Sequence, residues 1–146
     1  LTQCIGVILF GSFIGIVMTT HQLLSLIPVL FVACLLGGAF GALILSVLKS
    51  PRGVQQIFPL LIVPQIFLAG VFSPIKELPF HVLFLSRAMP MTYAVDLVRS
   101  VFYRDLPEYS EVVIFSTRTD VFVATGFFLA FIIIGTYLFV RNERNR

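Results

Sequence analysis

The segment from Leu23 to Leu48 reads LLSLIPVLFVACLLGGAFGALILSVL and contains no Asp, Glu, Lys or Arg. A helix that crosses the hydrocarbon core of a bilayer, roughly 30 Å thick, needs about 20 such residues. The chain has 146 residues, of which 58% are hydrophobic and only 12% are charged. A soluble domain carries about 25% charged residues, and one soluble core of this size could not bury so much apolar surface. The sequence therefore predicts an integral membrane protein.

Three more segments have the length and composition of membrane spans. Residues 1–18 and 121–140 are uncharged, and residues 54–72 carry glutamine as their largest polar side chain. A membrane span has to satisfy its own backbone hydrogen bonds, which a helix does. Together with residues 23–48, these segments predict an all-α fold, a polytopic transmembrane helix bundle of four spans.

The segment from 78 to 104 is also apolar, but it does not fit a span. It contains Arg87, Asp96 and Arg99, and each charge costs about 3 kcal/mol at the centre of a membrane helix. Pro90 lacks a backbone donor and interrupts the helix. We therefore expect a short pair of external or re-entrant helices that meet at Pro90 and cap the outer end of the bundle. Asp96 and Arg99 are three positions apart and are expected to pair; a plain amphipathic helix at the interface is the alternative.

The distribution of charge predicts how the chain is oriented. Four crossings place the turn at residues 49–52 and the C-terminal tail on the same side of the membrane. Both stretches are short and rich in Lys and Arg, whereas the basic residues of the other side are spread over residues 76–118 among several acids. Short basic loops stay in the cytoplasm. We therefore expect a cytoplasmic C-terminus.

A stripe of small side chains marks one face of the predicted helix 23–48. It consists of Ala33, Gly37 and Gly41. Such stripes let membrane helices approach closely, so we expect a tight helix contact here. There are two other interpretations: the stripe forms a subunit interface, or it reflects the usual composition of membrane helices.

The sequence lacks the patterns of catalysis and cofactor binding. No GxxxxGK[ST], HExxH or GxSxG motif occurs, and Cys4 and Cys34 lie outside any metal-binding pattern. We therefore expect no catalytic, cofactor-binding or metal-binding residues and a protein that is not an enzyme. No basic run with interleaved aromatic residues indicates nucleic acid. The predicted spans also lack the Asp, Glu, His, Lys or Arg that ion-coupled transporters use, so transport would need energy from a partner or from another part of the protein.

The most specific pattern follows the third predicted span. Residues 58–74 read FPLLIVPQIFLAGVFSP, Leu78-Pro79 follows, and residues 89–99 read MPMTYAVDLVR. This resembles the permeases of ABC-2-type exporters, in which a "P…flsGvffP" pattern is followed by "lP" and "P.ty.vd..R". The resemblance covers about Val54 to Arg104, with Ala69 where the family most often has Ser. The residues that match, to which we assign structural roles, are Pro64, Gly70, Phe72, Pro74, Pro79, Pro90, Thr92, Tyr93, Asp96 and Arg99.

The resemblance implies an architecture and a set of partners. Six spans per subunit are expected, so that residues 1–146 would be the C-terminal part of one membrane domain. Two further spans and the helix that contacts the ATPase would lie before Leu1. ATP would be bound by a separate ABC ATPase subunit, with no cofactor in this chain, and a second permease subunit would complete a homo- or heterodimer in the cell membrane.

The cargo follows less directly. Because the predicted spans carry no fixed charge, amphipathic or apolar cargo such as a drug or lipid is favoured, as in multidrug resistance. Members of the family also export polysaccharides, peptides or ions. A non-transporting membrane scaffold is the alternative outside the transport class.

Overall fold

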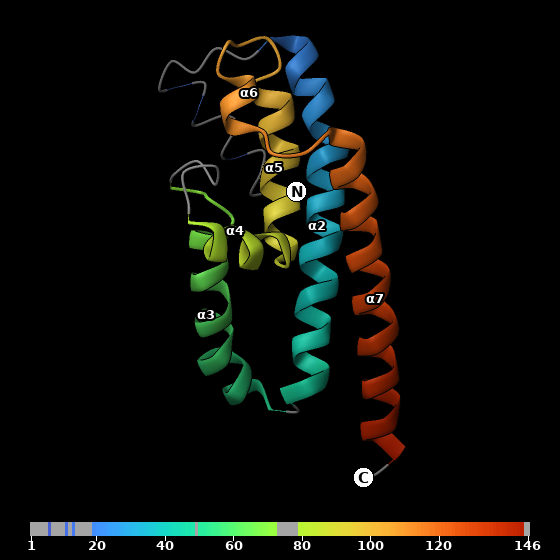
Figure 1. Ribbon diagram of the computed structural model, residues 1–146. Helices are drawn as coiled ribbons and strands as arrows, with labels where there is room; N and C mark the ends of the chain where they lie inside the picture. The colour runs from blue at the N-terminus through green and yellow to red at the C-terminus, as the bar shows by residue number, and fades with distance from the viewer. Residues whose placement is uncertain are drawn as a thin grey trace.

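The computed structural model of the chain describes residues 6, 11, 13, 19–48, 50–72 and 79–144 (Figure 1). Every regular element in these residues is an α-helix, which confirms the all-α prediction. Most of the predicted span at residues 1–18 lies outside the described residues, as does Pro74. The helices are α2 (Thr20–Leu48), α3 (Pro51–Leu68), α4 (Phe80–Arg87), α5 (Pro90–Phe102), α6 (Tyr109–Val112) and α7 (Thr117–Arg144).

The two longest helices contain the second and fourth predicted spans. Helix α2 begins three residues before the predicted start at Leu23 and ends at Leu48, as expected. Helix α7 extends beyond the apolar run 121–140 at both ends. At its start, the hydroxyl of Ser116 accepts a hydrogen bond from the Thr119 backbone N–H (3.3 Å), which satisfies one of the free amides of the first turn.

Helix α3 is shifted towards the N-terminus relative to the predicted span 54–72. Pro51 occupies its first turn, where a missing N–H costs nothing. At the other end, Gly70 has a positive φ of 69°. The Val71 N–H bonds to the Ile66 carbonyl (3.3 Å) and the Gly70 N–H to the Phe67 carbonyl (3.1 Å). This is the Schellman arrangement, and it ends the helix at Leu68 although the sequence stays apolar to Phe72.

Helices α4 and α5 form the predicted short pair. Pro79 immediately precedes α4, and Pro90 lies in the first turn of α5, so that the break falls where the sequence predicted it. Helix α6 is a single short turn that the sequence did not indicate. Whether α4 and α5 lie outside the membrane or enter it stays a prediction.

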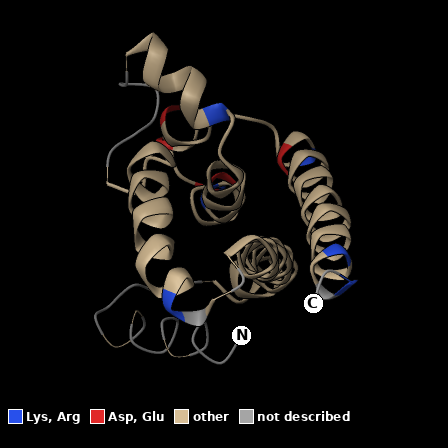
Figure 2. Cartoon of the chain, turned by 90° about the horizontal axis from the view of Figure 1, so that it is seen from below, with Lys and Arg blue, Asp and Glu red and all other residues tan. Residues whose placement is uncertain are grey.

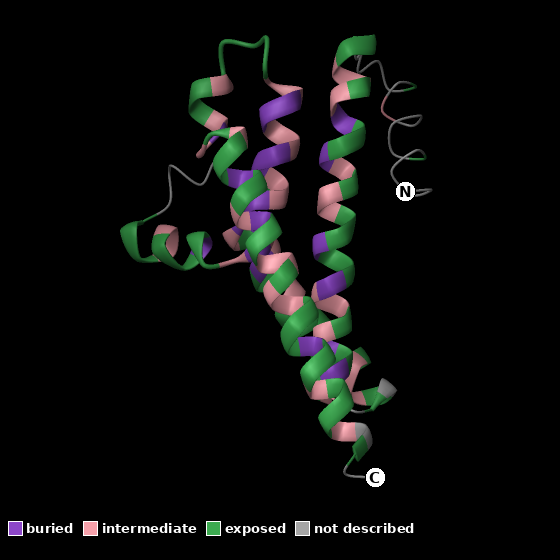
Figure 3. Ribbon diagram, turned by 90° about the vertical axis from the view of Figure 1, so that its right-hand side faces the viewer, coloured by how far each residue is buried: buried purple, intermediate pink, exposed green. Residues whose placement is uncertain are grey.

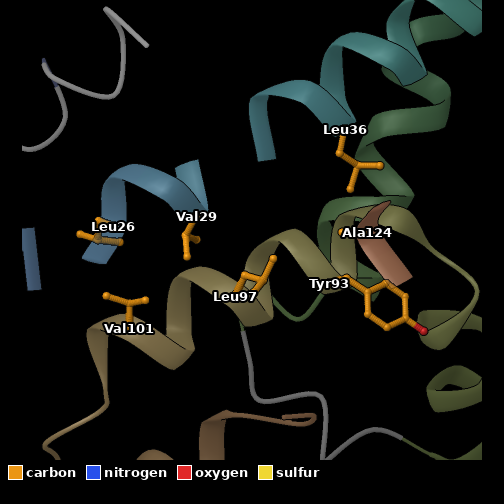
Figure 4. Packing of buried hydrophobic residues seen from close by; sticks show 7 residues of the cluster. All are labelled: Leu26, Val29, Leu36, Tyr93, Leu97, Val101 and Ala124. Atoms are coloured by element: carbon orange, nitrogen blue, oxygen red, sulfur yellow. The ribbon is translucent and has the colours of Figure 1, made fainter. Parts of the chain in front are cut away.

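The core forms where α5 packs against both α2 and α7, which also contact each other (Figures 1 and 3). Figure 4 shows Val101 and Leu97 of α5 facing Leu26 and Val29 of α2. Leu97 is fully buried, with 0% of its surface exposed. Because α5 covers the N-terminal half of α2, α5 is part of the bundle and not a detached surface element.

Helices α2 and α7 lie side by side and run in the same direction (Figure 1). The amide of Asn142, near the end of α7, donates to the Ser46 carbonyl near the end of α2 (2.8 Å). At the opposite end, the Gln22 amide of α2 donates to the Phe102 carbonyl at the end of α5 (3.5 Å). The turn between α2 and α3 and the end of α7 therefore lie at one end of the molecule, and α6 lies at the other.

Two segments among the described residues, Thr20–Leu48 and Tyr109–Asn142, are long and apolar enough to cross a membrane. Figure 2 shows charged residues mainly near helix ends, and α2 carries none. Helix α3, with 18 residues, is about 27 Å long at 1.5 Å per residue, slightly less than the hydrocarbon thickness. Two of the four predicted spans, 23–48 and 121–140, therefore correspond to helices long and apolar enough to cross a membrane.

The stripe of Ala33, Gly37 and Gly41 does not make the expected tight contact within the described residues. A Cβ added at Gly37 or Gly41 would meet no described atom within 4 Å. The close approach of α2 and α7 lies instead at Gly135, where an added Cβ would be 3.4 Å from the Cα of Leu43. The glycine at the close contact thus belongs to α7, where the sequence pattern predicted no helix contact.

Candidate functional site

The residues of the family pattern converge on α5 and the ends of its neighbours. Arg99 of α5 donates through Nη2 to the backbone carbonyl of Gly70, at the end of α3. The left-handed conformation of Gly70 turns the chain there. Arg99 therefore ties α5 to the end of α3, where the pattern begins.

The junction of α4 and α5 is closed by two hydroxyl groups. The Thr92 hydroxyl donates to the Ser86 carbonyl (2.6 Å), and the Tyr93 hydroxyl donates to the Arg87 carbonyl (2.6 Å). Both acceptors lie in the last turn of α4, where carbonyls have no partner within the helix. Thr92 and Ser86 are fully buried at 0% exposure. The Thr-Tyr pair of the pattern therefore caps α4.

Phe115 lies against the same junction. Its ring stacks on Tyr93, with centroids 5.6 Å apart and planes inclined by 19°. The guanidinium carbon of Arg87 lies 5.7 Å from the centroid of Phe115, within the range of a cation–π contact. The segment that leads into α7 is thus held against both short helices.

The carboxylate of Asp96 binds backbone N–H groups of the segment that leads into α7. One carboxylate oxygen accepts from the Ile114 N–H (3.0 Å) and the other accepts from the Phe115 N–H (2.8 Å). The side chain is almost fully buried, with 1% exposed. Burial raises the pKa of Asp96, while the amides of Phe115 and Ile114 and the charge of Arg99 act in the opposite direction.

The predicted contact between Asp96 and Arg99 is wrong. Among the described residues, Asp96 takes the amides of residues 114 and 115, and Arg99 takes the carbonyl of Gly70. The two charges still attract across the helix, since Arg99 lowers the pKa of Asp96. Each side chain turns instead to backbone groups that have no partner in their own segments, because leaving those groups buried and unpaired would cost free energy.

The other pattern residues surround this network without joining it. Pro64 lies within α3, and Phe72 is exposed with its ring 5.2 Å from that of Phe67. Pro79 and Pro90 begin the two short helices. Sequence reasoning missed Ser86, Arg87 and Phe115, because their roles depend on backbone carbonyls or on a ring contact that no spacing reveals. It also missed Asp120, which follows Ser116 and Thr119 at the start of an apolar run, a recognisable signal of a helix N-terminus.

A cavity of about 270 Å³ lies beside the network, between α2, α3 and α5. Its wall is almost entirely apolar and includes Leu36, Gly37 and Met91, with Gln65 as its polar residue. Gln65 is mostly buried, with 7% exposed. Such a cavity suits an apolar guest that carries few polar groups.

Comparison with known proteins places these observations in a family. The family model described as "ABC-2 type transporter" matches residues 1–103. Nodulation protein J of Rhizobium meliloti (strain 1021) is 32% identical over 99 residues, which cover 64% of the chain and 38% of that relative. The chain thus spans less than half the length of this relative. No solved structure matches the chain significantly.

Proposed function

The chain belongs to the ABC-2 type transporter family, and from this membership we propose that it is part of the membrane-spanning permease of an ATP-driven ABC exporter. The observation that carries the proposal is the family match over residues 1–103, which includes Asp96 and Arg99 themselves. The apolar helices α2 and α7 support a place in the membrane. As a transport component the chain is not itself a catalyst.

The proposed subunit crosses the membrane four times within these residues, at about 1–18, 23–48, 54–72 and 121–140, with the cap at about 78–104. The directions of the described helices support this topology, since α2 and α7 run the same way and α3, on the other side of α2 from α7, runs the opposite way (Figure 1). The basic turn at 49–52 and the C-terminal tail then face the cytoplasm of a multi-pass protein in the cell membrane.

Energy comes from a separate ABC ATPase subunit, which binds the ATP. Nucleotide binding favours one of two packings of the permease helices, and its hydrolysis restores the other. A second permease subunit, identical or different, lines the path with this one. In this mechanism the residues of the chain hold and transmit conformation and carry out no covalent chemistry.

The cargo is amphipathic or apolar, such as a drug or a lipid. The cavity between α2, α3 and α5 supports this choice, because its wall is apolar and Gln65 supplies a single amide. Polysaccharides, peptides and ions are the other cargo classes of the proposal, and each can be offered to the same transport assay.

The test is reconstitution of the complete permease in liposomes, with and without its ABC ATPase. We expect uphill movement of a lipid-like fluorescent cargo only when both the ATPase and ATP are present. An imposed proton or sodium gradient without the ATPase should move nothing. Uphill movement driven by such a gradient would overturn the proposal in favour of an ion-coupled transporter. A permease that neither co-purifies with an ATPase nor moves any cargo class would instead be a membrane scaffold.

A further inference from the structure

Asp120 is a buried acid without a donor. It lies in the first turn of α7, just before the apolar run 121–140, and none of its surface is exposed (0%). Neither of its carboxylate oxygens has a hydrogen-bond donor among the described residues. An ionised carboxylate buried without a partner strongly destabilises the folded state. The position therefore requires something that neutralises the charge.

The neighbour that Asp120 does have is a second carboxyl group. The carboxyl group of Asp96 in α5 lies beside that of Asp120, since each alters the pKa of the other through a side-chain hydrogen bond. Two ionised carboxylates offer only acceptors and repel each other, so a hydrogen bond between them requires a proton. Among the described residues, no third His, Cys, Asp or Glu joins them in a cluster that could hold a metal ion.

The backbone decides which of the two acids carries the proton. Both oxygens of Asp96 already accept N–H groups, from Ile114 (3.0 Å) and Phe115 (2.8 Å), and such bonds favour the charged form. Asp120 has no such donors. The charge therefore belongs on Asp96 and the proton on Asp120.

We propose that Asp96 and Asp120 form a proton-binding site, in which protonated Asp120 donates its hydroxyl to the Asp96 carboxylate and fastens the first turn of α7 to α5. Loss of the proton places two negative charges side by side in a buried position, and the first turn of α7 separates from α5. The site lies at the end of the molecule opposite the turn between α2 and α3.

Other charged groups near the pair do not replace the proton. Arg99 attracts Asp96 but donates its hydrogen bond to the Gly70 carbonyl. The Tyr93 hydroxyl lies within the electrostatic range of Asp120 and Arg87, but it donates to the Arg87 carbonyl. Helix α2 carries no Asp, Glu, Lys or Arg, and its His21 is exposed, as are Arg52 of α3 and His81 of α4. Glu111 of α6, which packs against α5, and Arg118 of α7 itself are both exposed.

The pH dependence has a definite sign. Burial and the negative charge of Asp96 raise the pKa of Asp120, the acid that carries the proton, to about 7. A carboxyl group with a raised pKa in the folded state contributes stability that is complete below the ordinary pKa of Asp. That contribution is lost as the pH rises through the raised value. Alkaline conditions therefore open the contact between α5 and α7.

The first test is infrared spectroscopy of the complete purified permease in lipid nanodiscs at neutral pH. The carbonyl stretch of a protonated carboxyl group should be present in the wild type and lost in Asp120→Asn. The matched control is Asp105→Asn, the same substitution at an exposed acid, which should leave the band unchanged. A wild-type spectrum without this band at neutral pH would overturn the proposal even if every variant failed to fold.

The second test is thermal unfolding of the same samples across a range of pH. The wild-type midpoint should fall by several degrees as the pH rises, whereas Asp120→Asn should hold its midpoint because the amide keeps donating to Asp96. Asp96→Asn should lower the midpoint at every pH, since its NH₂ group would face the N–H of Ile114 or Phe115. An Asp120→Asn midpoint that falls with pH as in the wild type would contradict the proposal. So would a wild-type midpoint that depends on added sodium or calcium at fixed pH, which would indicate a cation in place of the proton.

Discussion

Four side chains of α5 bond to backbone groups of other segments. Thr92 and Tyr93 donate to carbonyls at the end of α4, Arg99 donates to Gly70, and Asp96 accepts from the amides of residues 114 and 115. These bonds reach backbone groups at helix ends and in the segment before α7, where helical hydrogen bonds are incomplete. At the scale of the residue, the family pattern therefore describes a set of attachments between α5 and the chain around it.

Exchanging the charges of Asp96 and Arg99 tests this directly. Each single reversal should lower the yield of folded permease, because every buried backbone N–H or carbonyl left without its partner costs about 1–3 kcal/mol. The double variant Asp96→Arg/Arg99→Asp should recover none of the loss, since the partners are backbone groups of fixed polarity. Folded yield by size-exclusion chromatography and the unfolding midpoint are the measurements. The control is the exchange of exposed Arg104 and Asp105, which should be tolerated.

Recovery in the double variant would show that the two side chains bond to each other and that the attachments described above are not formed. Normal folding of both single variants combined with loss of export would point to a direct role in transport. Either result would contradict the structural role assigned to these residues.

At the scale of the element, the end of α3 depends on one backbone conformation. Gly70 has a φ of 69°, and its carbonyl accepts from Arg99. A residue with a Cβ loses about 1–2 kcal/mol in the left-handed region, so Gly70→Ala should lower the unfolding midpoint of the permease. The control is Gly126→Ala, which lies in α7 with no described atom within 4 Å of an added Cβ and should be neutral or slightly stabilising. Equal midpoints for both variants would be incompatible with the described end of α3.

The cavity between α2, α3 and α5 gives a prediction about cargo. Gly37 lines it, and an added Cβ there meets no described atom within 4 Å. Gly37→Leu should therefore place apolar volume in the cavity and lower ATP-dependent export of a lipid-like cargo several-fold while leaving folded yield unchanged. Gly38→Leu is the matched control, because Gly38 has equally open surroundings but does not line the cavity. If both variants export normally, cargo does not pass through this cavity.

The sequence predicts the helices much better than the contacts between them. Lipid excludes charge all along a span, so long stretches without Asp, Glu, Lys or Arg predict α2 and α7 from the sequence. The end of α3 is less visible, because the apolar run continues past Gly70 and only the conformation of that residue stops the helix. Asp120 cannot be recognised as buried, since it resembles exposed Asp105 until the path of residues 103–116 brings it beside Asp96.

At the scale of the whole molecule, the two ends of the bundle differ in composition. One end holds Arg52 at the start of α3 with Arg141 and Arg144 in the last turn of α7, and the other holds α6 with the acids Glu108 and Glu111. Helix α2 has 29 residues and is about 43 Å long at 1.5 Å per residue, more than the hydrocarbon thickness of roughly 30 Å. Its two ends should therefore lie on opposite sides of the membrane. The α2–α3 turn and the end of α7 would then lie on one side, and α6 on the other.

Single cysteines can establish which side is which. Ser50 in the turn between α2 and α3 and Glu108 beside α6 are both exposed. In a variant of the complete permease without its native cysteines, an impermeant thiol reagent should label Glu108→Cys in intact cells. Ser50→Cys should react only after the membrane is opened, because basic loops stay in the cytoplasm. Labelling of Ser50→Cys in intact cells would reverse the orientation, and labelling of both positions would mean that α2 does not cross the membrane.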